Sequence, residues 1–301
     1  MYKYINNKLQ IKQYITMNFK IYILFILSMF AVSSSPLIAR HLIHIDSISI
    51  SFWRMLIASL ILIFLDYYKN NNIFISREPK LILGGSLLGV HFCLFYTAIS
   101  VMPNNIVNAT VFGTMAPLFA LLIEVYQGKT INKKLIIGLL IVLFGSIIMF
   151  IYDFSFDSNL TYGNFLAILC SIAFGFVFIL SEQIRIKESS ISFSKNIFIY
   201  ASITILIIGL TTQTSLLINN LNDFIFLIIL GVIPTIVGHS VLYYLVKYIR
   251  PSIVASIPLG EPFIASVFAW FLFPGQILNS YIITGGIITL MGLFIIIQSK
   301  K

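Results

Sequence analysis

Apolar runs long enough to cross a bilayer, which takes about 20 residues, fill the chain, and basic residues recur in every second gap between them. Of the nineteen Lys and Arg residues, seventeen lie in the two tails and in these alternate gaps, while Arg40 is alone in the other gaps and Arg54 lies inside a run. Because basic residues in short loops are retained on the cytoplasmic side, this pattern predicts orientation as well as fold class. We expect about ten membrane crossings, with both termini in the cytoplasm.

The composition supports a membrane protein. The chain has 301 residues, of which 59% are hydrophobic and 10% are charged, whereas an ordinary soluble domain carries about 25% charged residues. The net charge of +9 is spread over the predicted cytoplasmic loops rather than gathered in one patch, which argues against nucleic acid as a partner. Cys93 and Cys170 lie inside apolar runs, so we expect neither a disulfide framework nor a metal cluster.

Each predicted span must be α-helical, because a segment in hydrocarbon has to satisfy its own backbone hydrogen bonds. Continuous Ile, Leu and Phe runs also differ from the alternating segments of a transmembrane β-barrel. The spans lie near residues 20–39, 48–66, 81–99, 107–126, 135–152, 164–182, 195–212, 224–246, 252–273 and 280–298. Residues 1–19 are predicted to be a cytoplasmic polar leader, and translation could start at Met1 or at Met17.

The two halves of the chain, residues 20–152 and 164–298, resemble each other. His91 and Pro103 recur as His239 and Pro251 at one constant offset, with similar aromatic residues between them. Each half continues with a proline-centred span and ends in a span with two glycines seven residues apart: Pro117, Gly138 and Gly145 in the first half, Pro262, Gly285 and Gly292 in the second. A repeat of five spans is odd, so the second copy must enter the membrane from the opposite side. We therefore predict an all-α integral membrane protein of two inverted five-helix repeats, with a solute site between them near mid-membrane.

Several short motifs occur in a particular order along the spans. They are Phe52-Trp53-Arg54, Tyr96-Thr97-Ala98-Ile99 before a Pro-Asn-Asn turn, Ala116-Pro117-Leu118-Phe119 and Glu261-Pro262-Phe263. With them the chain resembles, over about residues 20–298, the EamA family of the drug/metabolite transporter superfamily. The resemblance implies a ten-helix inner-membrane carrier, often an exporter of amino acids or other small metabolites. Such families usually carry Gly-Glu after the fourth and ninth spans, where this chain has Gly128-Lys129 and Pro274-Gly275-Gln276, so no role for those loop acids carries over.

Ionisable residues inside the predicted spans are candidates for solute binding or coupling, because such groups are costly in hydrocarbon and usually face a cavity or one another. Glu261 lies near the middle of the ninth span beside Pro262, which removes a backbone donor and is expected to kink the helix. Its carboxylate would bind a substrate amine, accept a proton, or pair with Arg54. His91 and His239 are counterparts in the repeat and would line the cavity, relay protons or form hydrogen bonds between helices.

The remaining candidates have supporting roles. Arg54 is expected to be structural or gating, with binding of a substrate carboxylate as the alternative, and the prolines near the helix breaks share the structural role: Pro103, Pro117, Pro251 and Pro262. Aromatic and small polar residues are candidates for the cavity wall: Tyr96, Tyr244, Asn108, Thr114 and Trp270. For the aromatic residues, interfacial anchoring and core packing are the competing interpretation.

The sequence thus predicts a secondary transporter, multi-pass in a bacterial inner membrane, that exports a small organic metabolite such as an amino acid. It would work by alternating access, coupled to protons or to the gradient of the solute itself. An uptake carrier or exchanger for a nucleotide-like metabolite is the alternative, and a membrane-embedded enzyme or a channel is more remote. We expect no catalytic residue, cofactor or metal. The expected partners are the solute, membrane lipid and protons, and the oligomeric state stays open.

Overall fold

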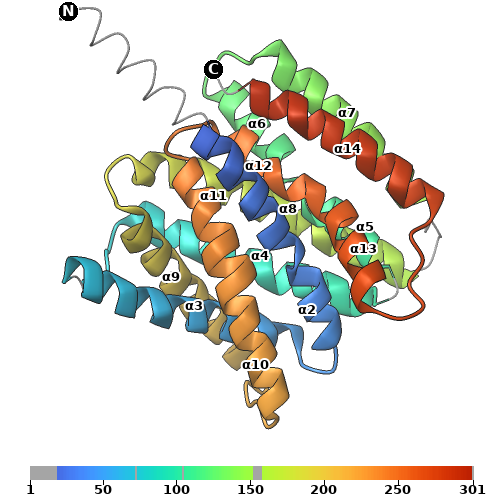
Figure 1. Cartoon of the computed structure of the whole chain (residues 1–301). Coiled ribbons are helices and arrows are strands. Elements are labelled where there is room, and N and C mark those ends of the chain that lie inside the picture. The colour runs from blue at the N-terminus through green and yellow to red at the C-terminus, as the bar shows by residue number, and fades with distance from the viewer. Residues whose placement is uncertain (1–18, 72, 104, 152–157, 300–301) are drawn as a thin grey trace, which may run out of the picture.

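The structure, a computed structural model, describes residues 19–71, 73–103, 105–151 and 158–299, and every regular element in those ranges is a helix (Figure 1). Ten segments of these ranges are long and apolar enough to cross a membrane: Phe19–His41, Ser47–Asn70, Pro79–Val101, Val107–Tyr126, Lys133–Ile151, Ser158–Arg185, Ser190–Thr211, Leu221–Leu245, Pro251–Leu272 and Ser280–Gln298. The ten predicted spans are confirmed, although the sixth and seventh begin several residues earlier than predicted. The predicted polar leader lies outside the described residues except for its last residue.

Continuous helices form six of the spans in the described ranges: α3 (Ser47–Asn70), α4 (Pro79–Val101), α7 (Lys133–Ile151), α8 (Ser158–Arg185), α9 (Ser190–Thr211) and α14 (Ser280–Gln298). The other four spans are interrupted or distorted. The first ends in α2 (Ser35–His41), and the fourth divides into α5 (Ile106–Gly113) and α6 (Ala116–Tyr126). The eighth consists of α10 (Leu221–Leu230), a π-helical segment (Gly231–His239) and α11 (Ser240–Leu245). The ninth consists of α12 (Pro251–Ala255), a 3₁₀ turn (Ile257–Gly260) and α13 (Glu261–Leu272).

Each of these four irregular regions contains a proline at or just after the break: Pro36, Pro117, Pro234 and, in the ninth span, Pro258 and Pro262. Proline has no N–H to donate and its ring clashes with the preceding turn, so a regular α-helix cannot run through it. The kinked, partly unwound ninth span therefore agrees with the expectation from Pro262. The irregular backbone brings polar groups into the middle of the molecule, which is tolerated in a membrane protein where the backbone is buried in protein or lines a cavity.

Helices α7 and α14 lie side by side and show how the two repeats are related (Figure 1). A Cβ atom added to Gly145 would lie 2.5 Å from the carbonyl oxygen of Gly285, and one added to Gly138 would lie 2.9 Å from that of Gly292. Glycines permit this close approach of two helix backbones. Because residue numbers rise along one helix as they fall along the other, the equivalent last helices of the two repeats pack antiparallel, as an inverted repeat requires.

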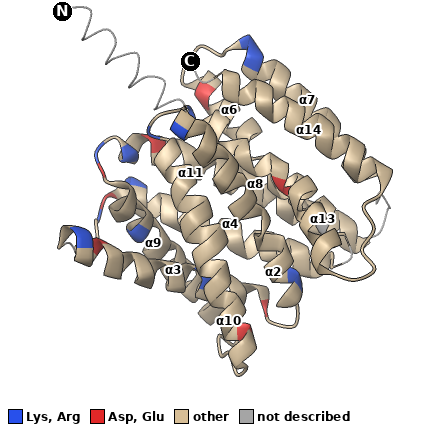
Figure 2. Cartoon of the chain, in the orientation of Figure 1, with Lys and Arg blue, Asp and Glu red and all other residues tan. Residues whose placement is uncertain are grey.

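Charged residues gather at one end of the molecule. Most of the described Lys and Arg residues lie on the side where the described chain begins and where α14 ends (Figure 2), and we call this side the basic end. Here the wholly buried Glu124 of α6 accepts a hydrogen bond of 2.6 Å from the Ser252 hydroxyl of α12. Lys129 Nζ lies 3.9 Å from Glu124 and 2.5 Å from Glu182 of α8. This polar network ties α6, α8 and α12 together and closes the basic end.

Candidate functional site

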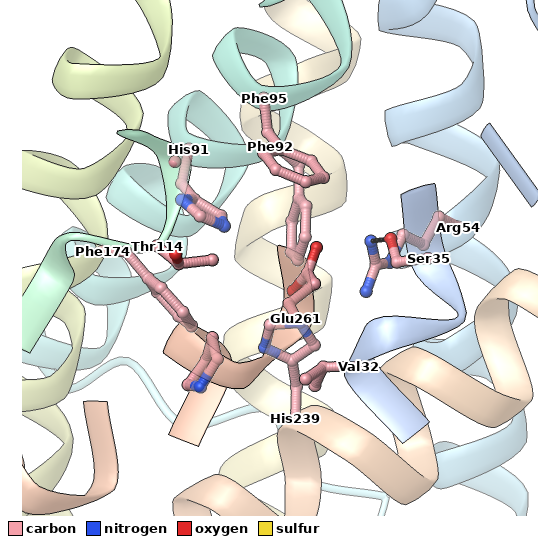
Figure 3. A pocket seen from close by; sticks show the side chains of 12 residues that line it. Val32, Ser35, Arg54, His91, Phe92, Phe95, Thr114, Phe174, His239 and Glu261 are labelled. Carbon is pink, nitrogen blue, oxygen red and sulfur yellow. Dashed lines mark hydrogen bonds between the residues drawn. The ribbon is translucent and has the colours of Figure 1, made fainter. Parts of the chain in front are cut away.

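Side chains from both repeats meet at a small cavity near the middle of the molecule, which we call the central cavity (Figure 3). Arg54 of α3, His91 of α4 and Thr114 at the break between α5 and α6 come from the first repeat. His239 of the π-helical segment and Glu261 of α13 come from the second. The cavity has a volume of about 20 Å³, which is room for about one water molecule. The structure thus brings together five of the predicted site residues, drawn from widely separated parts of the chain.

Glu261 owes its position to the break in the ninth span. It is the first residue of α13 after the 3₁₀ turn, and only 5% of it is exposed. Its Oε1 atom has no hydrogen-bond partner among the described residues, and no ion pair joins it to Arg54 there, although both side chains line the same cavity. A buried carboxylate without a partner is costly, so this group can bind a cation or take up a proton.

Arg54 is fixed by hydroxyl groups and by an aromatic ring. Its Nε donates to Thr235 Oγ1 at 2.7 Å, and its Nη1 donates to the hydroxyls of Ser35 at 2.9 Å and Tyr96 at 2.6 Å. The guanidinium carbon lies 4.1 Å from the ring centre of Phe92, close enough for a cation–π contact. These bonds leave Nη2 without a hydrogen-bond partner in the described part of the chain. Arg54 therefore has a rigid position and keeps its Nη2 group free to donate at the cavity.

The two histidines are linked through the aromatic rings of Phe92 and Phe174. His91 Nδ1 lies 3.1 Å from the carbonyl oxygen and 3.0 Å from Sγ of Cys170, and the His91 ring stacks on Phe174 with 4.2 Å between ring centres. The ring centre of His239 lies 5.5 Å from that of Phe174 and 5.2 Å from that of Phe92. His239 Nδ1 has no hydrogen-bond partner in the described residues. His91 is thus held by hydrogen bonds, whereas His239 keeps a free ring nitrogen.

The other predicted wall residues lie around this centre rather than in it. Tyr96 supports Arg54 as described, and Tyr244 accepts a hydrogen bond of 3.0 Å from Lys20 near the basic end. Asn108 is wholly buried, and its amide oxygen and nitrogen have no partner among the described residues. Trp270 is 50% exposed on the outer surface of α13. None of these four side chains is part of the wall of the central cavity.

Three of the four predicted prolines lie in the first turn of a helix. Pro117 and Pro262 each follow the first residue of a helix, α6 and α13, immediately after a break. Pro251 is the first residue of α12, and Pro103 lies in the connection between α4 and α5. At the first turn of a helix the missing N–H of proline costs nothing, so Pro117, Pro251 and Pro262 are compatible with the helices that they begin.

Two cavity residues, Ser35 and Phe174, and the Arg54 partner Thr235 were not singled out from the sequence, although Ser35 and Thr235 have a local signal. Ser35 precedes Pro36 and Thr235 follows Pro234, and a hydroxyl next to a proline in an apolar span is a natural ligand for a buried charge. Phe174, which contacts both histidines, carries no signal of its own among the 27 phenylalanines of the chain.

A second, larger cavity lies beside the central one, toward the end of the molecule opposite the basic end. Its volume is about 350 Å³, which is within the size range of small-molecule sites. It is lined by residues of α2, α5, α13 and α14 and of the connections next to them, and Pro262 and Ala265 of α13 form part of its wall. We call it the vestibule.

Comparisons with known proteins agree with this architecture. The model of the EamA-like transporter family matches residues 19–151 and again residues 161–298. An uncharacterized transporter from Archaeoglobus fulgidus is 24% identical over 254 residues, which are 83% of this chain and 86% of that protein. A solved crystal structure has the same fold, with a TM-score of 0.77 at 11% sequence identity over 94% of this chain and 98% of its own. Since the family model matches twice and covers nearly the whole chain, this multi-pass membrane protein belongs to the EamA-like transporter family.

Proposed function

We propose that the protein is a secondary transporter of the bacterial inner membrane that exports a small organic metabolite, such as an amino acid, by alternating access coupled to protons. The observation that carries this proposal is the central cavity. It lies where the two repeats meet, and it holds a buried carboxylate, a buried guanidinium and two imidazoles. In a conformation that widens this cavity beyond its present room for about one water, a solute with both an ammonium and a carboxylate group would satisfy the free Glu261 Oε1 and Arg54 Nη2 atoms together.

The arrangement of closed and open regions supports alternating access. The Glu124 network closes the basic end, and the vestibule lies toward the opposite end. If the basic end is cytoplasmic, as the charge pattern predicts, this conformation faces the outside of the cell. Transport then requires a second conformation, in which the bonds between α6 and α12 break and the walls of the vestibule close.

Glu261 is the coupling residue in this proposal, because it is the acid in the central cavity. The test is transport of radiolabelled amino acids in proteoliposomes across an imposed pH gradient. In Glu261→Gln we expect flux driven by the pH gradient to fall about tenfold or more, since a neutral amide has no proton to exchange. Exchange of solute across the membrane without a pH gradient should persist at higher solute concentrations, since the amide oxygen still accepts a hydrogen bond from an ammonium group.

The matched control is Glu78→Gln, which removes the same charge at an exposed position before α4. It should leave the flux unchanged. Full proton-driven flux in Glu261→Gln would refute the role of Glu261 in coupling. Absence of flux for every solute in the wild-type protein would refute the transport proposal itself.

A further inference from the structure

Arg40 gives the vestibule a chemical character that differs from that of the central cavity. Arg40, in the last turn of α2, is the one charged side chain among the described residues that line the vestibule. It is also the single Lys or Arg that the sequence places in the loops opposite the basic end. The sequence places the other Lys and Arg residues outside the spans at the basic end, so a single arginine on this side departs from the charge pattern of the chain. The side chain of Arg40 forms part of the vestibule wall.

The contacts of Arg40 orient its guanidinium but do not neutralise it. When the amide oxygen of Gln276 is turned toward Arg40, it accepts from Nη1 at 3.3 Å and from Nη2 at 3.1 Å. The guanidinium carbon lies 5.1 Å from the ring centre of Phe273. Within the described ranges no acidic side chain forms an ion pair with Arg40. Arginine has five N–H donors, so most of them remain available to a ligand.

The rest of the vestibule wall combines apolar side chains with neutral polar groups. Leu37, Val107 and Ile282 contribute hydrocarbon surface. The hydroxyl of Ser266 donates within its own helix to the carbonyl of Pro262 at 2.7 Å, and that of Thr110 donates to the carbonyl of Val107 at 2.9 Å. These hydroxyls are therefore already used as donors. Arg40 is the one charged donor among the described residues of this wall, so the wall favours a ligand with a negatively charged head and an apolar body.

We propose that the vestibule is a second binding site, in which Arg40 binds the carboxylate of an amphiphilic solute on its way between the central cavity and the membrane surface. A guanidinium binds a carboxylate through two parallel hydrogen bonds, and the Gln276 and Phe273 contacts hold the Arg40 group in place for this. The vestibule volume of about 350 Å³ accommodates a small carboxylic acid. The proposal rests on the proposed transport function, and it adds a second site that binds the carboxylate of the transported solute.

Binding can be measured with two probes of nearly the same size and shape, the charged 4-methylpentanoate and the neutral 4-methylpentanamide. Thermal unfolding of the full-length protein in detergent is followed at increasing concentrations of each, because a ligand stabilises the fold that it binds. We expect the carboxylate, but not the amide, to raise the melting temperature of the wild type. In Arg40→Gln the apparent dissociation constant for the carboxylate should rise about tenfold, as loss of a charged hydrogen-bond pair implies. Arg40→Lys should recover part of the affinity.

The matched control is Arg77→Gln, which removes an arginine at an exposed position at the basic end and should bind like the wild type. Equal stabilisation of the wild type by the amide and the carboxylate would overturn the proposal, and this comparison needs no variant to fold. Carboxylate binding that is unchanged in Arg40→Gln would also overturn it. So would a shift that depends on Arg40 but appears with phosphatidylglycerol and not with 4-methylpentanoate, because the occupant would then be a lipid headgroup.

Transport separates this inference from the proposed function. If the proteoliposomes transport an amino acid equally well with wild type and with Arg40→Gln, the vestibule site is refuted and the transport function stands. If carboxylate binding depends on Arg40 but no solute is transported, the site stands and the transport function is refuted.

Discussion

Some buried charged residues in the described part of this molecule form ion pairs and others do not. Lys195 of α9 and Asp66 of α3 are both wholly buried, with 2.6 Å between Nζ and Oδ2, and Lys195 also donates to the carbonyl of Phe74 at 2.9 Å. Arg54 and Glu261, in contrast, share a cavity without forming an ion pair in the described structure. The Lys195–Asp66 pair therefore has its charges satisfied inside the fold. Arg54 and Glu261 keep the capacity to interact with something that enters.

Breaking the Lys195–Asp66 pair from one side should destabilise the protein strongly. In Asp66→Asn the buried ammonium loses its counter-charge, and we expect the free energy of unfolding to fall by about 3–5 kcal/mol. The double variant Asp66→Leu with Lys195→Met should recover much of this loss, since it removes both charges. Thermal unfolding in detergent measures the difference, with Lys133→Met as the control at an exposed position. A melting temperature of Asp66→Asn equal to that of the control would contradict the structural role of the pair.

The inverted repeat is visible in how equivalent helices pack against each other, as α7 and α14 do. The contact between α7 and α14 depends on two glycine pairs that leave no space for a side chain: a Cβ atom on Gly145 would lie 2.5 Å from both the Gly285 carbonyl oxygen and Thr289 Oγ1. Gly84 in α4 is also helical and buried, but the nearest atom to a Cβ there would be 3.8 Å away. The two glycines look alike in the sequence and differ only in how near the next helix comes.

This difference gives a matched test of helix packing. Gly145→Ala should force α7 away from α14 and lower the free energy of unfolding by about 1–3 kcal/mol, the range for overpacking a tight contact. Gly84→Ala should be neutral or stabilising, because alanine favours a helix over glycine by about 0.8–1 kcal/mol. The test is to compare the melting temperatures of the two variants in the same detergent, where Gly145→Ala should melt at the lower temperature. Equal melting temperatures would mean that the α7–α14 contact is looser than the structure indicates.

For the molecule as a whole, the features that could be predicted from the sequence are those that depend on residues close together in the chain. Span lengths, the break at Pro262 and the order of the two repeats follow from hydrophobicity and from residues near one another in the chain. The partners of Arg54 could not be predicted in this way, because Ser35, Tyr96 and Thr235 lie 19, 42 and 181 residues from it. Long-range contacts of this kind are decided by how the helices pack. The same reason explains why the absence of a Glu261–Arg54 ion pair in the described structure was not predicted. The sequence placed both residues at one cavity, but how their side chains point depends on the packing of the helices.

The orientation and the conformation of the molecule can be tested together with cysteine labelling. Ser266 lines the vestibule, and the two native cysteines, Cys93 and Cys170, are buried, so they should contribute little background. A membrane-impermeant maleimide should label Ser266→Cys in right-side-out vesicles. Lys133→Cys, exposed at the basic end, should be labelled only in inside-out vesicles.

The two labelling results test different parts of the argument. Labelling of Lys133→Cys in right-side-out vesicles would mean that the basic end faces outward, against the retention of positive loops in the cytoplasm. Ser266→Cys that is labelled in neither preparation would mean that water does not reach the vestibule, and the carboxylate site at Arg40 would then have no access. If labelling of Ser266→Cys slows when a transported solute is added, the vestibule closes or fills during transport. That result would connect the space beside Arg40 to the central cavity at Glu261, because α13 forms part of both walls.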